Sequence, residues 1–149
     1  GFLDTEITGD LVTASGENLR GRDAGNAPKF SGNVALNWET NLADSLTLRV
    51  SPNVFYSTSY IAGGAERKFD PVTNRLGYLE QGSYTTIDLN ISLLSLASDW
   101  RVSLIARNLT DKQTITGAGP APFRPPTGDD QLVNFNRGRQ VFVEAAYNF

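Results

Sequence analysis

The side chains that most resemble a binding site lie in two long polar segments. They are three residues of segment 61–82 and one arginine in a proline-rich stretch: Arg67, Lys68, Tyr78 and Arg124. Guanidinium and ammonium groups pair with carboxylates and phosphates, so these residues predict contacts with an anionic small molecule. For each of them the alternative is an ordinary solvated residue at the tip of a surface hairpin.

Catalytic and metal chemistry find little support. The sequence has no cysteine and no histidine, which excludes disulfides, thiol chemistry and the common soft metal sites. We interpret Asp129 and Asp130 as a polar turn rather than a cation site. Asp88 and Glu144 show no pairing typical of an acid and a base. We therefore expect no catalytic residue, no metal and no cofactor. The net charge of −3 argues against a nucleic-acid partner.

The elements that must position these residues read as β-strands. From Phe30 to Trp38 the even positions are apolar or glycine, whereas most odd positions are polar. Such alternation is typical of a strand with one apolar and one polar face. Further runs of this kind cover 46–60, 87–93, 100–107 and 139–149, with a weaker first strand over 1–8.

The connections between these runs alternate in length. Links at 41–44 and 96–99 are short, whereas 9–28, 61–82 and 111–136 are long and polar. We expect an all-β, antiparallel up-and-down meander of about six strands, with the long loops on one side.

Two local features qualify this pattern. Pro52 lies inside the second run, where proline cannot donate to a ladder, so we expect a bulge or a missing hydrogen bond. Asp70-Pro71 with Asn74 predicts a hairpin within the loop 61–82.

The apolar face could meet either lipid or a protein core. A soluble β-sandwich or lipocalin-like barrel alternates in the same way. Charged residues in mid-strand on the polar face, such as Arg49 and Arg101, favour a water-filled interior. Aromatic residues near the strand ends suggest the interface girdles of a membrane barrel: Phe30, Trp38, Tyr56, Tyr60 and Trp100.

About six strands cannot close a transmembrane barrel, because the smallest examples use eight. The chain also lacks methionine and begins without a signal segment. We therefore expect it to be an excerpt from a longer protein.

Several motifs in order resemble the last part of TonB-dependent outer-membrane receptors. The residues that carry the resemblance are Gly1-Phe2-Leu3-Asp4-Thr5-Glu6-Ile7, Asn26-Ala27-Pro28-Lys29-Phe30, Tyr84-Thr85-Thr86-Ile87-Asp88-Leu89, Asn108-Leu109-Thr110-Asp111-Lys112, Gly138-Arg139 and the terminal Phe149. Two positions depart from the family pattern: Thr110 stands where an aromatic residue is usual, and Glu144 where glycine is frequent.

The resemblance implies that residues 1–149 are the C-terminal portion of a large, roughly 22-stranded transmembrane β-barrel with a plugged lumen. It implies import of a scarce ligand, such as a ferric siderophore, across the outer membrane of a Gram-negative bacterium. The plug and the segment that contacts the TonB complex are not in this sequence. Asn108, Leu109, Asp111 and Lys112 form the family motif near the end of the penultimate strand.

The terminal aromatic residues have an implied partner of their own. Tyr147 and Phe149 resemble the signal read by the barrel assembly machinery. The alternative is two aromatic residues at a membrane interface.

Three other functions remain open. The chain could be a complete small outer-membrane barrel of structural or adhesion type, or a soluble ligand-binding β-domain. An enzyme embedded in a barrel, such as a protease or lipase, would need a cluster that the histidine-free sequence does not offer.

Overall fold

The computed structural model describes residues 1–13, 16–62, 68–70, 75–77, 79–95, 97, 99–120 and 131–148, with backbone only at 68–70, 75–77, 119–120 and 131. Over these ranges the chain is all β, without a helix. The strands are β1 (Ser31–Ala35), β2 (Trp38–Ala43), β3 (Leu46–Ser57), β4 (Tyr60–Ile61), β5 (Lys68–Asp70), β6 (Arg75–Gly77), β7 (Glu80–Gln81), β8 (Tyr84–Ser95), β9 (Trp100–Arg107), β10 (Ile115–Pro120), β11 (Gln131–Phe135) and β12 (Gln140–Tyr147).

The chain divides into two compact units. The first, here called the loop unit, comprises Gly1–Ser31, Ser57–Tyr84 and Gln113–Asn136. The second, the sheet unit, comprises Gly32–Tyr56, Thr85–Lys112 and Arg137–Phe149. We describe each unit by itself.

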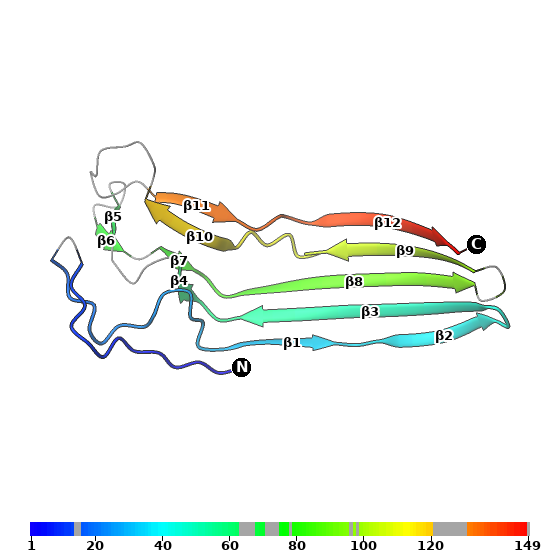
Figure 1. Ribbon diagram of the computed structural model, residues 1–149, viewed down its shortest axis with the longest axis horizontal. Coiled ribbons are helices and arrows are strands. Elements are labelled where there is room, and N and C mark those ends of the chain that lie inside the picture. The colour runs from blue at the N-terminus through cyan, green and yellow to red at the C-terminus, as the bar shows by residue number, and fades with distance from the viewer. Residues whose placement is uncertain are drawn as a thin grey trace. The chain divides into compact units, whose positions relative to one another are not determined.

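One six-stranded sheet dominates the sheet unit. Its order is β1-β3-β8-β9-β12, and β2 pairs with β3, as β1 does (Figure 1). The strands β4 to β7, β10 and β11 form separate small sheets, so the neighbours in the large sheet are successive strands of that sheet along the chain. The pairs β2–β3, β8–β9 and β9–β12 are antiparallel. The predicted antiparallel meander of about six strands is therefore confirmed.

Pro52 interrupts the edge of this sheet. Trp38 lies opposite Val50, and the same register places Leu36 opposite Pro52. The Leu36 N–H donates to the Pro52 carbonyl at 3.0 Å, but proline has no N–H to return the bond. The ladder breaks here, between β1 and β2, so the predicted missing bond is confirmed.

The two short connections differ in how well they were predicted. The link 96–99 lies between the end of β8 and the start of β9, as expected. The link predicted at 41–44 is wrong by a few residues, because β2 continues to Ala43 and the turn occupies Asp44 and Ser45. A register shift between Asn41 and Ala43 accommodates the longer strand.

The predicted first strand over residues 1–8 is wrong. Only an isolated bridge between Phe2 and Phe30 forms, supported by a hydrogen bond from the Leu3 N–H to the Lys29 carbonyl at 3.0 Å. The bridge does not extend into a ladder, because further along the segment the Ile7 N–H donates to the Arg22 carbonyl at 2.9 Å instead.

The long loops contain their own short ladders. In the loop unit β4 pairs with β7, β5 with β6, and β10 with β11. The pairing of Lys68 with Gly77 and of Asp70 with Arg75 confirms the hairpin predicted in segment 61–82. The segment 9–28 folds back on itself, since the Leu19 N–H donates to the Leu11 carbonyl at 2.9 Å. It also bonds to the preceding residues, since the Gly21 N–H donates to the Ile7 carbonyl at 2.8 Å.

Buried apolar side chains are scarce. Among the described residues they are Leu19, Ala62 and Ala106. A water-soluble domain of this size would normally bury many more. The described residues therefore form no core that could cover the large apolar side chains of the sheet.

Candidate functional site

The most extensive candidate surface is one face of the sheet. Antiparallel registers bring apolar residues of three strands into rows. These rows are Leu89–Ala106–Val141, Ile91–Leu104–Val143 and Leu93–Val102–Ala145. Leu104 is 42% exposed and Val143 is 74% exposed. The rows form an apolar surface that is most exposed on β9 and β12, at Val102, Leu104, Val141 and Val143, whereas Ala106 is buried.

The opposite face is polar. The Arg101 guanidinium lies 2.7 Å from the Glu144 carboxylate, and Arg49 lies 2.7 Å from Glu39. Both pairs are cross-strand contacts, and their side chains are about half exposed. Near them the Ser92 and Ser103 hydroxyls are hydrogen-bonded. This face is suited to water.

Apolar residues also occur on the polar face. Phe142 lies opposite Ile105 on this face and is 46% exposed. Phe55 lies an even number of positions after Arg49 along β3, so it also lies on the polar face. The alternation is thus strong but not complete.

Two of the five predicted interface aromatics have clear places at strand ends. Trp100 begins β9 directly opposite Tyr147 of β12, beside the short link 96–99. Tyr56 lies at the other end of β3. Trp38 begins β2 opposite Val50, further from the turn than predicted, because β2 extends to Ala43.

The remaining two aromatics belong to the loop unit. The Phe30 and Phe2 rings are tilted to each other with centroids 5.1 Å apart. The Tyr60 hydroxyl donates to the Ile115 carbonyl at 3.2 Å. Burial raises the pKa of the Tyr60 hydroxyl above its ordinary value, and the charge and hydrogen bond of Tyr84 raise it further.

Residues 108–112, which carry one of the motifs of the resemblance, form a tightly bonded turn in the sheet unit. Asn108 is 8% exposed and has a positive φ of 51°, and Asp111 has a φ of 52°. Asparagine and aspartate tolerate this left-handed region better than most residues. The Asn108 carbonyl accepts from the Asp111 N–H at 2.9 Å, which closes the turn.

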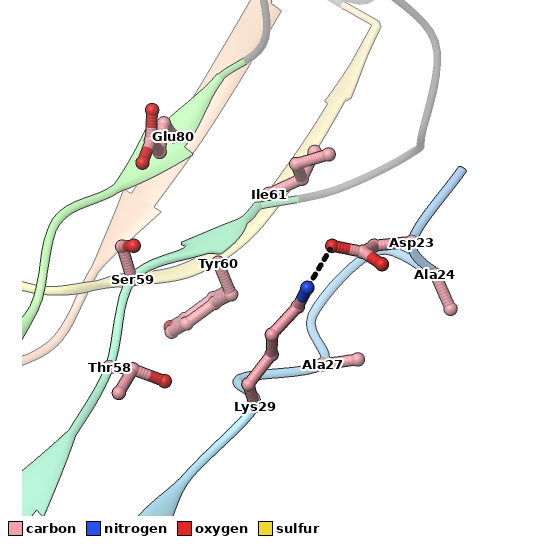
Figure 2. A pocket seen from close by; sticks show the side chains of 9 residues that line it. All are labelled: Asp23, Ala24, Ala27, Lys29, Thr58, Ser59, Tyr60, Ile61 and Glu80. Carbon is pink, nitrogen blue, oxygen red and sulfur yellow. Dashed lines mark ion pairs between the residues drawn. The ribbon is translucent and has the colours of Figure 1, made fainter. Parts of the chain in front are cut away.

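A hollow of about 270 Å³ lies within the loop unit (Figure 2). Its wall combines Asp23, Lys29, Tyr60 and Glu80 with small and hydroxyl-bearing residues. Lys29 points toward Asp23, and their charged atoms are 3.5 Å apart (Figure 2). With one cation and two carboxylates the wall has a net negative charge, so it suits a neutral or cationic polar molecule better than an anion.

A second hollow, of about 280 Å³, lies in the sheet unit. Trp100, Arg101 and Asp99 contribute to its wall. The Asn148 N–H donates to the Asp99 carbonyl at 3.0 Å beside it.

Comparison of the chain with protein-family models, with curated proteins and with solved structures found no match in any of the three. Function must therefore be argued from the geometry and from the resemblance in the motifs.

The residues predicted to bind an anionic ligand are not brought together in the described structure. Arg67, Tyr78 and Arg124 lie outside the described residues, as does Phe149. Lys68 is described by its backbone alone, paired with Gly77. These assignments remain predictions.

Two further features concern metal binding and membrane-spanning helices. The described ranges contain no group of three or more acidic residues arranged to hold a metal ion. They contain no helix that is long and apolar enough to span a membrane.

Sequence reasoning missed the hollow of the loop unit. Asp23, Lys29 and Glu80 come from separate segments, and no spacing pattern connects them. It did single out the motif at Asn108 and the Gly138-Arg139 pair, but as two separate signatures. The structure brings both into one cluster.

Proposed function

We propose that the sheet unit is part of the wall of an outer-membrane β-barrel, with its apolar face in contact with lipid. The observation that carries this proposal is the exposed apolar face, on which Val143 and Leu104 remain accessible. Burying apolar surface away from water contributes about 25 cal/mol per Å². A surface of this extent in water would favour aggregation, whereas hydrocarbon accommodates it.

Strand length supports lipid over a soluble core. β3 and β8 have 12 residues each. Such a strand is roughly 40 Å long, and at a tilt of about 45° it spans roughly 28 Å, close to a bilayer's hydrocarbon thickness. Strands of soluble proteins most often have about 5–6 residues.

The edges of the sheet support a larger barrel. Among the described strands, β12 pairs with β9 alone, and β1 and β2 pair with β3 alone; the other side of β1 bonds to the described chain at Ser31, whose N–H donates to the Gly1 carbonyl at 3.1 Å. An unpaired backbone group in lipid costs several kcal/mol. We propose that further strands complete a closed barrel, which by the resemblance to TonB-dependent receptors would have roughly 22 strands.

The polar face then lines the lumen. Exposed ion pairs such as Arg101 with Glu144 are compatible with water there. Following the resemblance, we propose that the whole protein is a TonB-dependent receptor that imports a scarce ligand such as a ferric siderophore. Arg67, Lys68, Tyr78 and Arg124 are the proposed ligand contacts. The proposal assigns no covalent chemistry to the chain.

Location is the first test. The full-length protein is produced in a Gram-negative host, the membranes are fractionated, and samples are run with and without heating on a denaturing gel. We expect the protein in the outer membrane, with faster migration when unheated. A water-soluble, heat-insensitive monomer would instead favour the soluble β-domain.

Transport is tested separately, with iron-55 bound to a hydroxamate siderophore as the probe. We expect uptake that requires both this protein and TonB. Outer-membrane location without uptake would reject hydroxamate siderophores as the ligand class but would leave the proposal of a barrel wall standing. Location in the membrane as a complete barrel of eight strands would favour the small structural barrel.

A further inference from the structure

The terminal strand β12 has no short turn to set its register. β8 and β9 are joined by the link 96–99, which limits how they can pair. β9 and β12 are instead separated by residues 108–139. A slip by one residue would move Val143 and its apolar neighbours onto the face of Arg101 and Ser103. Something other than connection length must hold the observed register.

The motif turn is bonded to the strand on one side of β9. The Asn108 N–H donates to the Asp88 carboxylate at 2.8 Å. The Leu109 N–H donates to the Ile87 carbonyl at 2.8 Å. The Thr110 hydroxyl donates to the Thr85 carbonyl at 2.9 Å. These bonds fix the turn on β8.

The same turn reaches the approach to β12 on the other side. The Asn108 side-chain amide donates to the carbonyls of Lys112 at 2.9 Å and of Arg137 at 3.2 Å. Its carbonyl oxygen accepts from the Lys112 N–H at 3.1 Å. A single buried side chain therefore closes the turn and holds the backbone at Arg137.

Asp111 and Gly138 complete the contact. Asp111 Oδ1 accepts from the Arg139 N–H at 2.8 Å, one residue before β12 begins. A Cβ at Gly138 would lie 2.9 Å from this same oxygen. Glycine therefore leaves room for the carboxylate beside the backbone of Arg139, and a Cβ at this position would force the Asp111 carboxylate to shift.

We infer that residues 108–112 are a clasp that fixes the register of β12 on β9. Asn108 and Asp111 are positioning residues, and Gly138 admits the Asp111 carboxylate. The clasp decides which side chains of the terminal strand face each side of the sheet. It acts whether the apolar face meets lipid or protein, so it does not depend on the proposed function.

The register can be read directly by cross-linking. The chain has no cysteine, so any disulfide within this region comes from the two cysteines that are introduced. Ser103→Cys with Glu144→Cys is the native pair, because these residues lie directly opposite each other. Ser103→Cys with Val143→Cys or with Ala145→Cys reports slips of one residue. In the native register the two side chains of each offset pair point to opposite faces of the sheet and should form disulfides poorly.

The test combines each pair with clasp variants in the full-length protein, with cysteines elsewhere replaced. With the native clasp we expect oxidation to link residues 103 and 144. Asp111→Ala and Gly138→Ala should each lower that yield by about fivefold and raise an offset pair. Asp111→Asn keeps an oxygen acceptor and should retain most of the native yield. The double variant Asp111→Ala with Gly138→Ala should give the same 103–144 yield as Asp111→Ala alone, because the Gly138 Cβ acts through the Asp111 carboxylate.

Asp99→Ala is the matched control. Asp99 is also an aspartate at positive φ, 48°, in a turn of the sheet unit. It lies outside the clasp, so the 103–144 yield should not change. If Asp111→Ala prevents folding, Gly138→Ala provides the readout, because it removes no clasp side chain and adds a single methyl group beside the Asp111 carboxylate. An unchanged 103–144 yield in folded Gly138→Ala and Asp111→Ala proteins would overturn the inference.

Discussion

Ser92 of β8 and Ser103 of β9 lie directly opposite each other, with their hydroxyl oxygens 2.9 Å apart. They are only 7% and 3% exposed, whereas the adjacent Leu104 is 42% exposed. The sheet thus shields small polar side chains and leaves large apolar ones accessible. This is the reverse of a soluble domain, and it is the basis on which we propose a lipid-facing wall.

Replacing Pro52 should stabilise the edge of the sheet. Pro52→Val supplies the N–H that the ladder lacks opposite Leu36, and a β-branched side chain suits its apolar parity. We expect the free energy of unfolding to rise by about 1 kcal/mol, measured by urea titration of the heat-modifiable band. Pro28→Ala, at a proline outside the strands, is the control. A loss of stability in Pro52→Val would contradict the register described here.

The strand pattern was predictable because each face of the sheet has a uniform environment. Alternation therefore identified 87–93, 100–107 and 139–149 nearly as they occur. It failed at residues 1–8, since Phe2 has the right parity but no neighbouring strand beyond the bridge to Phe30. Whether a segment pairs with another strand depends on distant residues, and the alternation within the segment does not show this.

The Arg101–Glu144 pair should contribute little to stability. Both side chains are about half exposed, and solvent screens such pairs. We expect Glu144→Gln to lower the free energy of unfolding by less than about 1 kcal/mol, and less still at high salt. Glu39→Gln, which disrupts the similarly exposed pair with Arg49, should behave alike. A loss of roughly 3–5 kcal/mol would indicate a dry interior on this face instead.

Stability should depend on Tyr60 at alkaline pH. Its pKa in the folded protein is raised from 10.0 by burial, with Tyr84 adding to the effect. The fold therefore favours the neutral phenol, and this stability is complete below the unfolded pKa and is lost as pH rises from the unfolded pKa through the higher folded pKa. Thermal midpoints from about pH 8 to about pH 11 should fall more steeply for the native protein than for Tyr60→Phe. Parallel curves would show that ionisation of Tyr60 is not linked to folding.

The terminal aromatic residue should matter for assembly. Phe149 lies outside the described residues, so this prediction rests on the resemblance of Tyr147 and Phe149 to the assembly signal. Deleting Phe149 from the full-length protein should lower the yield of heat-modifiable barrel without lowering synthesis. Phe149→Tyr keeps an aromatic ring and should retain most of the yield. Equal barrel yields for the deletion and the native protein would reject the signal.

The candidate sites were less predictable than the strands. The motif at Asn108 was visible in the sequence, but its contacts with Asp88 and with Arg139 through Asp111 depend on three strands meeting. The wall of the loop-unit hollow depends on residues as distant as Asp23 and Glu80. Such clusters follow from the topology and leave no local signature.

The most direct test of the lipid-facing wall is a spin-label scan along β12 in the full-length protein reconstituted in lipid vesicles. Val143 and Glu144 are adjacent and lie on opposite faces. We predict that a label at 143 collides with oxygen dissolved in the bilayer, whereas a label at 144 collides with a water-soluble nickel chelate. Labels at 141 and 145 should follow 143, and a label at 142 should follow 144. A label at 143 that neither reagent reaches would place this face in a protein core and contradict the account.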